Sequence, residues 1–225
     1  MKKPLMIAFD GPSASGKSTL AEKLAENLSY LYFDTGVMYR AVTYASIQRK
    51  IPAEKEKEIS ELSAKITIDV NPASKKDGRK NDILLEGQDI TWEISKPEVE
   101  ALVSLVSSYA LVRQEMTEQQ RRIGKRGRVV MVGRDIGTVV LPEADLKIYL
   151  DASVEERAKR RYEERIRRGE KIEYQQVLEG MQKRDLLDSS RKIAPLQAAK
   201  DAIVIQSDGF SSEEILKKVI SIIEE

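Results

Sequence analysis

The chain has 225 residues and nearly balanced charge, with 38 lysines and arginines, 37 acidic residues, no cysteine and no histidine. Hydrophobic residues make up 41% and charged residues 33%, which is typical of a globular domain rather than a disordered chain. The missing residue types exclude disulfides, thiolate and imidazole metal sites, and histidine-based catalysis, so acid–base chemistry must come from carboxylates, lysine or tyrosine.

The same composition bears on partners and location. Balanced charge and only 5% aromatic residues argue against a module that binds RNA or DNA. The apolar run over 5–9 is too short for a secretory signal, and no run has the apolar length of a membrane span. We expect a cytoplasmic protein with no nucleic-acid or membrane partner, and a monomer because no surplus apolar helix is evident.

Hydrophobic periodicity and turn residues predict the elements in chain order. They are a strand over 5–9, helices from 17 and over 37–49, strands over 66–70 and 83–90, helices over 97–108 and 111–123, strands over 129–132 and 146–150, helices over 154–168 and 173–190, a strand over 202–205 and a helix after 211. Alternating strands and helices predict an α/β fold with a central parallel sheet covered on both faces. The period-two segment 66–92 interrupts this alternation and predicts a small antiparallel insertion with a mobile tip over 71–82.

A glycine-rich loop joins the first strand to the first helix. Residues 11–18 match the pattern G-x-x-x-x-G-K-[ST], and its predicted ATP-binding residues are Gly11, Pro12, Ser13, Ala14, Ser15, Gly16, Lys17, Ser18 and Thr19. The glycines let backbone N–H groups curl around phosphate oxygens, and the following helix adds the positive end of its dipole. Lys17 is predicted to reach the β- and γ-phosphates, and the Ser18 hydroxyl to bind Mg²⁺.

A phosphate loop alone does not choose a reaction, because GTPases, motors, transporters and small-molecule kinases share it. No guanine-reading N-K-x-D segment is evident, whereas arginines recur outside the loop, as expected of a kinase that holds two phosphorylated molecules together. The candidates are Arg40 after Asp34-Thr35-Gly36, Arg113, Arg134 with Asp135 at a strand end, and Arg184, Asp188 and Arg191 on one helical face.

Each candidate has a simpler alternative. A helix arginine is often only a solvated charge, Asp188 could pair with Arg184 or Arg191, and Asp135 could be a Mg²⁺ ligand. The helix over 154–168 carries six arginines and four glutamates, so it is either a mobile lid over the phosphates or a solvated helix with i,i+4 ion pairs.

Several segments together resemble one family. They are 7–12 before the loop, 34–40, 85–90, 133–140, 183–185 and 188–191, and the resemblance to bacterial-type cytidylate kinases, a branch of the nucleoside monophosphate kinases, covers nearly the whole chain. It implies a single P-loop kinase domain of the three-layer NTPase fold. The core would be about 1–35, 110–152 and 190–225. The acceptor-binding lobe with the insertion would be about 36–109, and the helical lid about 153–172.

The resemblance also implies residue roles. Ser104, Arg113 and Asp135 would face cytosine, and a carboxylate that accepts from the cytosine N4 amino group would disfavour uracil. Arg40 and Arg134 would hold the CMP phosphate, Asp188 the ribose with Thr35 nearby, and Arg191 would work close to the phosphates and sugar. Asp34 would be a further substrate-binding residue. Lys17, Arg184 and Arg157 would be the catalytic groups around the transferring phosphate.

The implied reaction is transfer of the γ-phosphate from ATP, with Mg²⁺, to CMP or dCMP in pyrimidine metabolism. The nearest alternatives are kinases of UMP, AMP or shikimate, against which the insertion and the Gly133-Arg134-Asp135 strand end argue. An alternative of another class is a nucleotide-dependent switch, which would bind ATP without consuming CMP.

Overall fold

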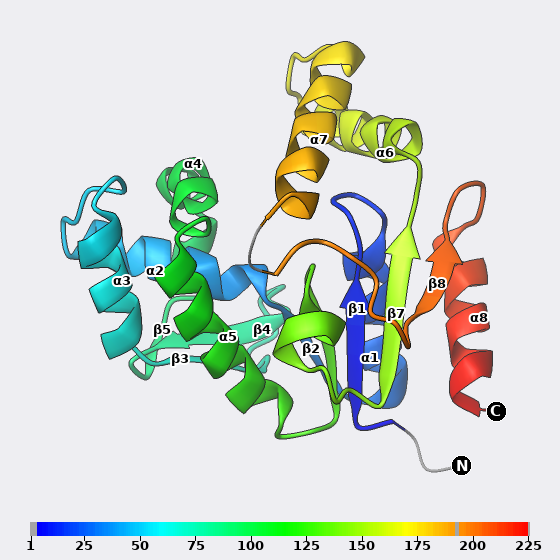
Figure 1. Ribbon diagram of the computed structural model, residues 1–225, viewed down its shortest axis with the longest axis horizontal. Coiled ribbons are helices and arrows are strands. Elements are labelled where there is room, and N and C mark those ends of the chain that lie inside the picture. Colours follow the sequence, from blue (N-terminus) through cyan, green and yellow to red (C-terminus); the bar gives the residue numbers. More distant parts are fainter. Residues whose placement is uncertain (1–3, 192–193, 225) are drawn as a thin grey trace. The chain divides into compact units, whose positions relative to one another are not determined.

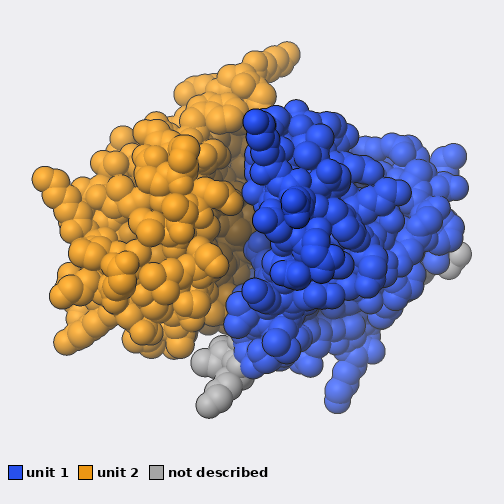
Figure 2. Space-filling view, turned by 90° about the horizontal axis from the view of Figure 1, so that it is seen from above, with its two compact units in different colours: residues 1–30, 130–225 blue, residues 31–129 orange. Residues whose placement is uncertain are grey.

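The computed structural model describes residues 4–191 and 194–224. The chain forms two compact units, one of Met1–Tyr30 with Val130–Glu225 and the other of Leu31–Val129 (Figure 2). Among the described helices, none combines the length and apolarity that crossing a membrane requires. The predicted core segment 190–225 includes residues 192 and 193, which lie outside the described residues, as residues 1–3 and 225 do.

The larger sheet confirms the predicted α/β fold. Its strands are β1 (Met6–Asp10), β2 (Leu31–Asp34), β6 (Val129–Val132), β7 (Leu146–Asp151) and β8 (Ile203–Gln206), in the spatial order β2-β6-β1-β7-β8 (Figure 1). β1 pairs in parallel with β7, with Asp10 opposite Tyr149. Strand β1 lies in the middle of the sheet and its residues Ile7, Ala8 and Phe9 are fully buried. The carboxyl end of β1, where open parallel sheets place their ligands, therefore carries the glycine-rich loop.

Four helices complete unit 1. They are α1 (Lys17–Leu28), α6 (Val154–Arg167), α7 (Tyr174–Ser189) and α8 (Ser212–Glu224). α1 packs against α8, and α6 packs against α7 (Figure 1). The predicted cap of α8 is confirmed, because Glu214 N donates to Ser211 Oγ at 3.3 Å and Ser211 N donates to Glu214 Oε2 at 2.8 Å.

Unit 2 contains the predicted antiparallel insertion. Besides β2, which belongs to the larger sheet, the described elements of unit 2 are α2 (Gly36–Gln48), α3 (Glu56–Lys65), β3 (Ile68–Pro72), β4 (Asn81–Leu85), β5 (Gln88–Asp89), the 3₁₀ turn η1 (Glu93–Ser95), α4 (Pro97–Val106) and α5 (Ala110–Gly124). β3, β4 and β5 form an antiparallel sheet in that order. The sequence predicted one strand over 83–90, but Glu86 and Gly87 take φ of 50° and 83° and turn the chain back between β4 and β5.

Ion pairs join side chains at the tip of the insertion, and its predicted mobility stays a prediction. The Arg79 guanidinium donates to Asp77 Oδ2 at 2.8 Å, to Asp82 Oδ1 at 2.9 Å and to Asp89 Oδ2 at 2.7 Å. Only 3% of the Arg79 side chain is exposed, so the guanidinium is enclosed by its three carboxylates. These contacts hold the pKa of Asp77 and of Asp89 well below the ordinary range.

Candidate functional site

The phosphate loop adopts a backbone that its glycines make possible. Gly11 has φ 146°, and a Cβ at this position would lie 2.1 Å from the backbone oxygen of Leu150. Gly16, with φ 93°, is the N-cap of α1, and no side chain caps the helix there. The first N–H groups of α1 therefore face the loop without a capping side chain, which is the arrangement that binds an anion. Ser18 and Thr19 lie in the first turn of this helix.

Three arginines bind the outer side of the loop through alternate carbonyls. We call this set the carbonyl clamp: Arg134 Nη1 donates to Gly11 O, Arg157 Nη1 to Ser13 O and Arg160 Nη1 to Ser15 O, each at 3.3 Å. In a trans peptide the N–H points away from the preceding carbonyl. The N–H groups of Ala14 and Gly16 therefore point away from the clamp, as a phosphate cradle requires.

The Lys17 side chain folds back onto the phosphate loop. Its ammonium donates to the carbonyl of Pro12 at 2.8 Å, and the residue is buried. Because the ammonium group interacts with a loop carbonyl, it is held at the loop itself and not in solvent. A phosphate bound in the loop would meet this charge directly.

A buried carboxylate joins the loop to the end of β6. Asp10, the last residue of β1, accepts hydrogen bonds from Ile136 N at 2.8 Å and Gly137 N at 2.7 Å. These residues begin η2 (Ile136–Val140), a short π-helical turn directly after Arg134 and Asp135. Burial raises the pKa of Asp10 to about 6, and nearby Asp135 adds to the rise while the two N–H groups and Lys17 oppose it.

Arginines also gather around Asp188 on α7. Asp188 is buried and forms ion pairs with Arg134, at 2.5 Å from Nε to Oδ2, and with Arg191. Burial lowers the pKa of Arg184, and the nearby positive charges of Arg134, Arg161 and Arg191 lower it further. The guanidinium groups of Arg134, Arg184 and Arg191 thus lie near one carboxylate, which leaves an excess of positive charge suited to phosphate. The alternative in which Asp188 pairs with Arg191 is confirmed, and Arg134 is its second partner.

The predicted catalytic Arg157 is held by other protein groups in this structure. Its guanidinium forms a bidentate pair with Asp185, at 3.1 and 2.6 Å, and its Nε donates to Ala152 O at 2.9 Å. The residue is 4% exposed. Arg157 therefore links α6 to α7 and to the loop, and its catalytic role stays a prediction.

Arg160 on α6 and Arg168 at its C-terminal end form the predicted helical ion pairs. Arg160 pairs with Glu156 at 3.0 Å, and Arg168 pairs with Glu164 at 2.5 Å. Arg160 also donates to Ser207 O at 3.0 Å, so it joins α6 to the segment after β8 as well as to the loop. The helix is thus partly solvated, and it also contacts the phosphate loop.

The other predicted acceptor residues lie in unit 2. Asp34 Oδ1 accepts from Gly36 N at 2.9 Å at the start of α2, where Thr35 is the buried N-cap. Arg40 on α2 pairs with Glu100 on α4 at 2.5 Å. The two predicted cytosine contacts of this unit differ in environment, since Ser104 is exposed on α4 whereas Arg113 on α5 is buried with its guanidinium 5.6 Å from the centre of the Tyr39 ring.

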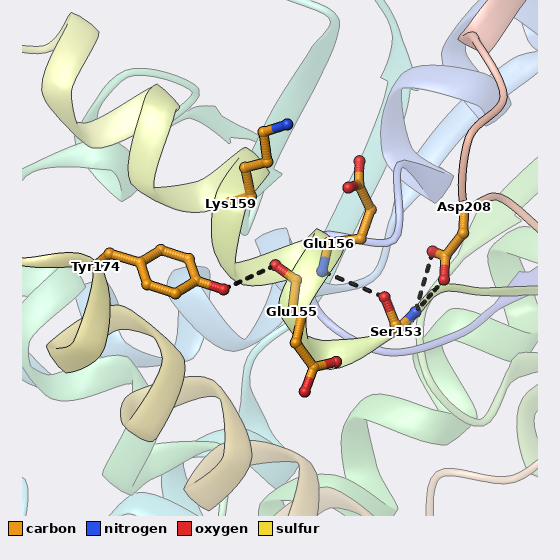
Figure 3. A pocket seen from close by; sticks show the side chains of 6 residues that line it. All are labelled: Ser153, Glu155, Glu156, Lys159, Tyr174 and Asp208. Atoms are coloured by element: carbon orange, nitrogen blue, oxygen red, sulfur yellow. Dashed lines mark hydrogen bonds between the residues drawn. The ribbon is translucent and has the colours of Figure 1, made fainter.

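An open pocket of about 320 Å³ lies at the start of α6. It is lined by Ser153, Glu155, Glu156, Lys159, Tyr174 and Asp208 (Figure 3). Asp208 accepts from Ser153 N at 3.1 Å, and the Tyr174 hydroxyl donates to Glu155 O at 3.3 Å (Figure 3). Three carboxylates against one lysine make this pocket a poor site for phosphate.

Sequence reasoning missed several residues of this site. Asp10, Asp185 and Ser207 were given no role, and Arg160 and Arg161 were treated only as members of an arginine-rich helix. An acid that directly follows a buried strand, as Asp10 does, is the one sequence signal that could have been used. Asp185, Ser207 and Arg160 have contacts with distant segments, which no local spacing reveals. Arg161 pairs locally with Glu164, but its place near Arg184 on α7 also has no local signal.

Comparisons with known proteins agree with this geometry. The family model described as cytidylate kinase matches residues 7–225. The chain is 44% identical to a cytidylate kinase of Bacillus subtilis, covering 100% of this chain and 99% of that protein. It is 48% identical to a cytidylate kinase of Chloroflexus aggregans, covering 98% and 94%. An uncharacterised protein from Eubacterium ventriosum shares the fold, with TM-score 0.53, 13% identity and coverage of 98% and 99%. The chain belongs to the cytidylate kinase family.

Proposed function

We propose that the protein transfers the γ-phosphate of ATP to CMP or dCMP, giving CDP or dCDP and ADP. The observation that carries this proposal is the pairing of a phosphate loop with a cluster of arginines around Asp188, in a chain of the cytidylate kinase family. A switch that only bound ATP would need the loop but not a second group of phosphate-binding cations.

The donor side of the site is the loop. Backbone N–H groups within 11–19 bind the phosphates of ATP, and Lys17 neutralises charge between the β- and γ-phosphates. Magnesium fits this site through the Ser18 hydroxyl, a hard oxygen ligand in the first turn of α1. Among the described residues, no group of three or more acidic side chains is arranged so that it could hold a metal ion by itself. In kinases, phosphates and water supply most of the Mg²⁺ ligands. When bound, the ion neutralises the β- and γ-oxygens.

The residues proposed to bind the acceptor CMP form two sets, one in unit 1 and one in unit 2. In unit 1, Arg134 and Arg191 bind phosphate oxygens, Asp188 binds the ribose and Asp135 accepts from the cytosine amino group. In unit 2, the residues assigned to CMP on the family resemblance are Asp34, Thr35, Arg40, Ser104 and Arg113. A buried carboxylate at position 135 rejects uracil, because the O4 atom of uracil would face it as a second acceptor.

Chemistry needs no general base. The attacking atom is an α-phosphate oxygen of CMP that is already anionic, so it attacks the γ-phosphorus without losing a proton. This suits a chain that contains no histidine. Arg184 on α7 and Arg157 on α6 are both assigned to neutralise the negative charge of the transferring phosphate. The pKa of Arg184 is lowered first by burial and then by neighbouring positive charges, and an incoming phosphate would offset both effects.

The test is ADP release coupled to a spectroscopic readout, with Mg²⁺ and ATP and with CMP, dCMP, UMP, AMP or shikimate as acceptor. Strong turnover with CMP and dCMP alone supports the whole proposal. Turnover with another acceptor keeps the kinase but discards the assignment of Asp135 and Arg113 to the base. Without any acceptor-dependent turnover, the switch becomes the better description.

A pair of lysine variants tests the loop in the same assay. Lys17→Ala removes the cation of the loop and is expected to lower kcat by about 100-fold or more. Lys23→Ala is the matched control, because Lys23 lies on the same helix and pairs only with exposed Glu213. Near-normal turnover by Lys17→Ala contradicts the role of the loop.

A further inference from the structure

The carboxylate of Asp10 occupies an unusual place for a buried charge. It ends the central strand β1, directly before the first glycine of the phosphate loop, and is 4% exposed. Both of its oxygens are used: Oδ1 accepts from Ile136 N and Oδ2 from Gly137 N, at 2.8 and 2.7 Å. A buried carboxylate is costly unless it is paired or hydrogen-bonded, and here two backbone N–H groups supply those bonds.

The two bonds fix the segment that carries the proposed acceptor residues of unit 1. Ile136 and Gly137 follow Arg134 and Asp135 directly, so their backbone positions decide where those side chains begin. Asp135 itself has φ −144° and ψ 24°, outside the regular helix and strand regions, and it immediately precedes η2. A backbone that leaves regular structure at this point needs an external partner, and Asp10 supplies it.

Two further contacts join the same two strand ends. Gly133 N donates to Phe9 O at 3.0 Å, and Arg134 Nη1 donates to Gly11 O at 3.3 Å. Asp10 is the residue between Phe9 and Gly11, so three consecutive residues of the β1 end hold the segment after β6. Of these links, only the two from Asp10 bind the segment after Asp135. Together with the contacts of Gly133 and Arg134, they hold the backbone on both sides of Asp135.

We propose that Asp10 is a positioning residue for the acceptor: it holds the turn after Asp135 against the start of the phosphate loop and so sets where Arg134 and Asp135 meet CMP. This inference rests on the proposed function. Asp10 need not contact either nucleotide. Its two acceptor oxygens transmit the position of the loop to the acceptor residues through the backbone of Ile136 and Gly137.

The variant Asp10→Asn tests this proposal with minimal change of shape. The amide keeps one acceptor oxygen but turns an N–H donor toward the second backbone N–H, so one hydrogen bond is lost and two donors face each other. We expect KM for CMP to rise about 10-fold or more and the preference for CMP over UMP, measured as kcat/KM, to fall. The Kd of a non-hydrolysable ATP analogue, measured by titration calorimetry, is expected to change less than about three-fold.

A matched control lies at the other end of the same strand. Asp145 Oδ2 accepts from both Leu5 N and Met6 N at 2.8 Å, so it also fastens β1 through two consecutive backbone N–H groups. Asp145→Asn is expected to leave KM for CMP and the CMP-to-UMP preference unchanged. If both variants changed these quantities equally, Asp10 would be a general support of the strand and the proposal would fail.

A second variant keeps the test valid if Asp10→Asn does not fold. Asp10→Ser keeps a hydroxyl that can accept one hydrogen bond but is too short to reach both Ile136 N and Gly137 N, so it weakens the hold on the turn without placing a second N–H donor there. It should raise KM for CMP in the same way. Unchanged KM and base preference in either folded variant overturn the role of Asp10, as does an equal loss of ATP-analogue affinity. If the wild type itself does not phosphorylate CMP, the proposed function fails first.

Discussion

In the proposed acceptor site, Asp135 is the residue assigned most directly to the choice of base. It is buried and lies near a second carboxylate, so a donor such as the cytosine amino group is a favourable partner. Asp135→Asn presents either an oxygen or an N–H to the base, and we expect the ratio of kcat/KM for CMP over UMP to fall about 10-fold or more, equivalent to about 1.4 kcal/mol. The same steady-state assay with both substrates checks it. An unchanged ratio would remove Asp135 from base recognition.

Asp10 also predicts how stability depends on pH. Its pKa is raised in the folded protein from an ordinary value near 3.8 to about 6, so the folded state binds the proton more tightly than the unfolded state. Asp10 therefore contributes stability at low pH that is lost as pH rises through about 6. The difference in unfolding free energy between wild type and Asp10→Asn should increase by about 1 kcal/mol from pH 7 to pH 5.

Denaturant titrations at these two pH values measure that difference. Asp135 and Lys17 face Asp10 in both proteins, and the acidic residues of the insertion are also shared, so their own titrations largely cancel in the comparison. A difference that stays constant with pH would show that the pKa of Asp10 is ordinary.

At the scale of single residues, sequence predicts chemistry that depends on local spacing. The loop residues Gly11, Gly16 and Lys17 were found because their pattern is contiguous and lies between a strand and a helix. Asp10 was not found, because its partners lie 126 and 127 positions away and are backbone groups without sequence identity. The tie between Arg157 and Asp185, 28 positions apart, was missed for the same reason.

That tie joins two elements, α6 and α7, and its strength can be measured. Arg157→Lys keeps the charge but loses the bidentate geometry, and Asp185→Asn removes the negative charge from a largely buried arginine. Each variant is expected to lower the free energy of unfolding by about 2 kcal/mol, with a coupling of about 1 kcal/mol or more in the double variant. Chemical denaturation provides the measurement.

An exposed pair on the same helix serves as the control for this cycle. Arg168 pairs with Glu164 near the end of α6, and Arg168→Ala should change the free energy of unfolding by less than about 0.5 kcal/mol. Additive effects of Arg157→Lys and Asp185→Asn would contradict the tie. A kcat loss in Arg157→Lys far beyond that in Asp185→Asn would support a direct catalytic role for Arg157.

Among the elements, those with strong periodicity were predicted within a few residues of their bounds. α2, α4, α5 and α6 are examples. The sequence did not predict α3, whose window is rich in charge, or β2, a strand of four residues with three partly exposed positions. The π-helical turn η2 was missed because its conformation depends on Asp10, a tertiary contact, and not on the intrinsic preference of Ile136–Val140.

At the scale of the whole molecule, we expect the binding of ATP to raise the free energy of unfolding. A ligand that binds only the folded state adds about 2.7 kcal/mol to the free energy of unfolding when its concentration is 100 times Kd. We expect Mg²⁺ with an ATP analogue to raise Tm in the wild type and in Lys23→Ala, but far less in Lys17→Ala. Differential scanning calorimetry provides the measurement, and an equal shift in all three proteins would place the nucleotide elsewhere.

The fold class followed from the order of elements, because alternating strands and helices leave few topologies for a chain of this length. The division into core, acceptor lobe and lid stays a prediction, since it came from the family resemblance. The two compact units divide the chain at residues 30–31 and 129–130, boundaries that fall beside or within strands and that no linker composition marks.

The carbonyl clamp has a consequence for the entropy of binding. Arg134, Arg157 and Arg160 hold alternate carbonyls of the loop through contacts that involve no nucleotide, so protein side chains restrict the loop backbone. The conformational entropy of the loop is then lost during folding and not during each catalytic cycle. The clamp thus makes the loop a preorganised receptor, whose affinity for ATP depends on side chains that need never touch the nucleotide.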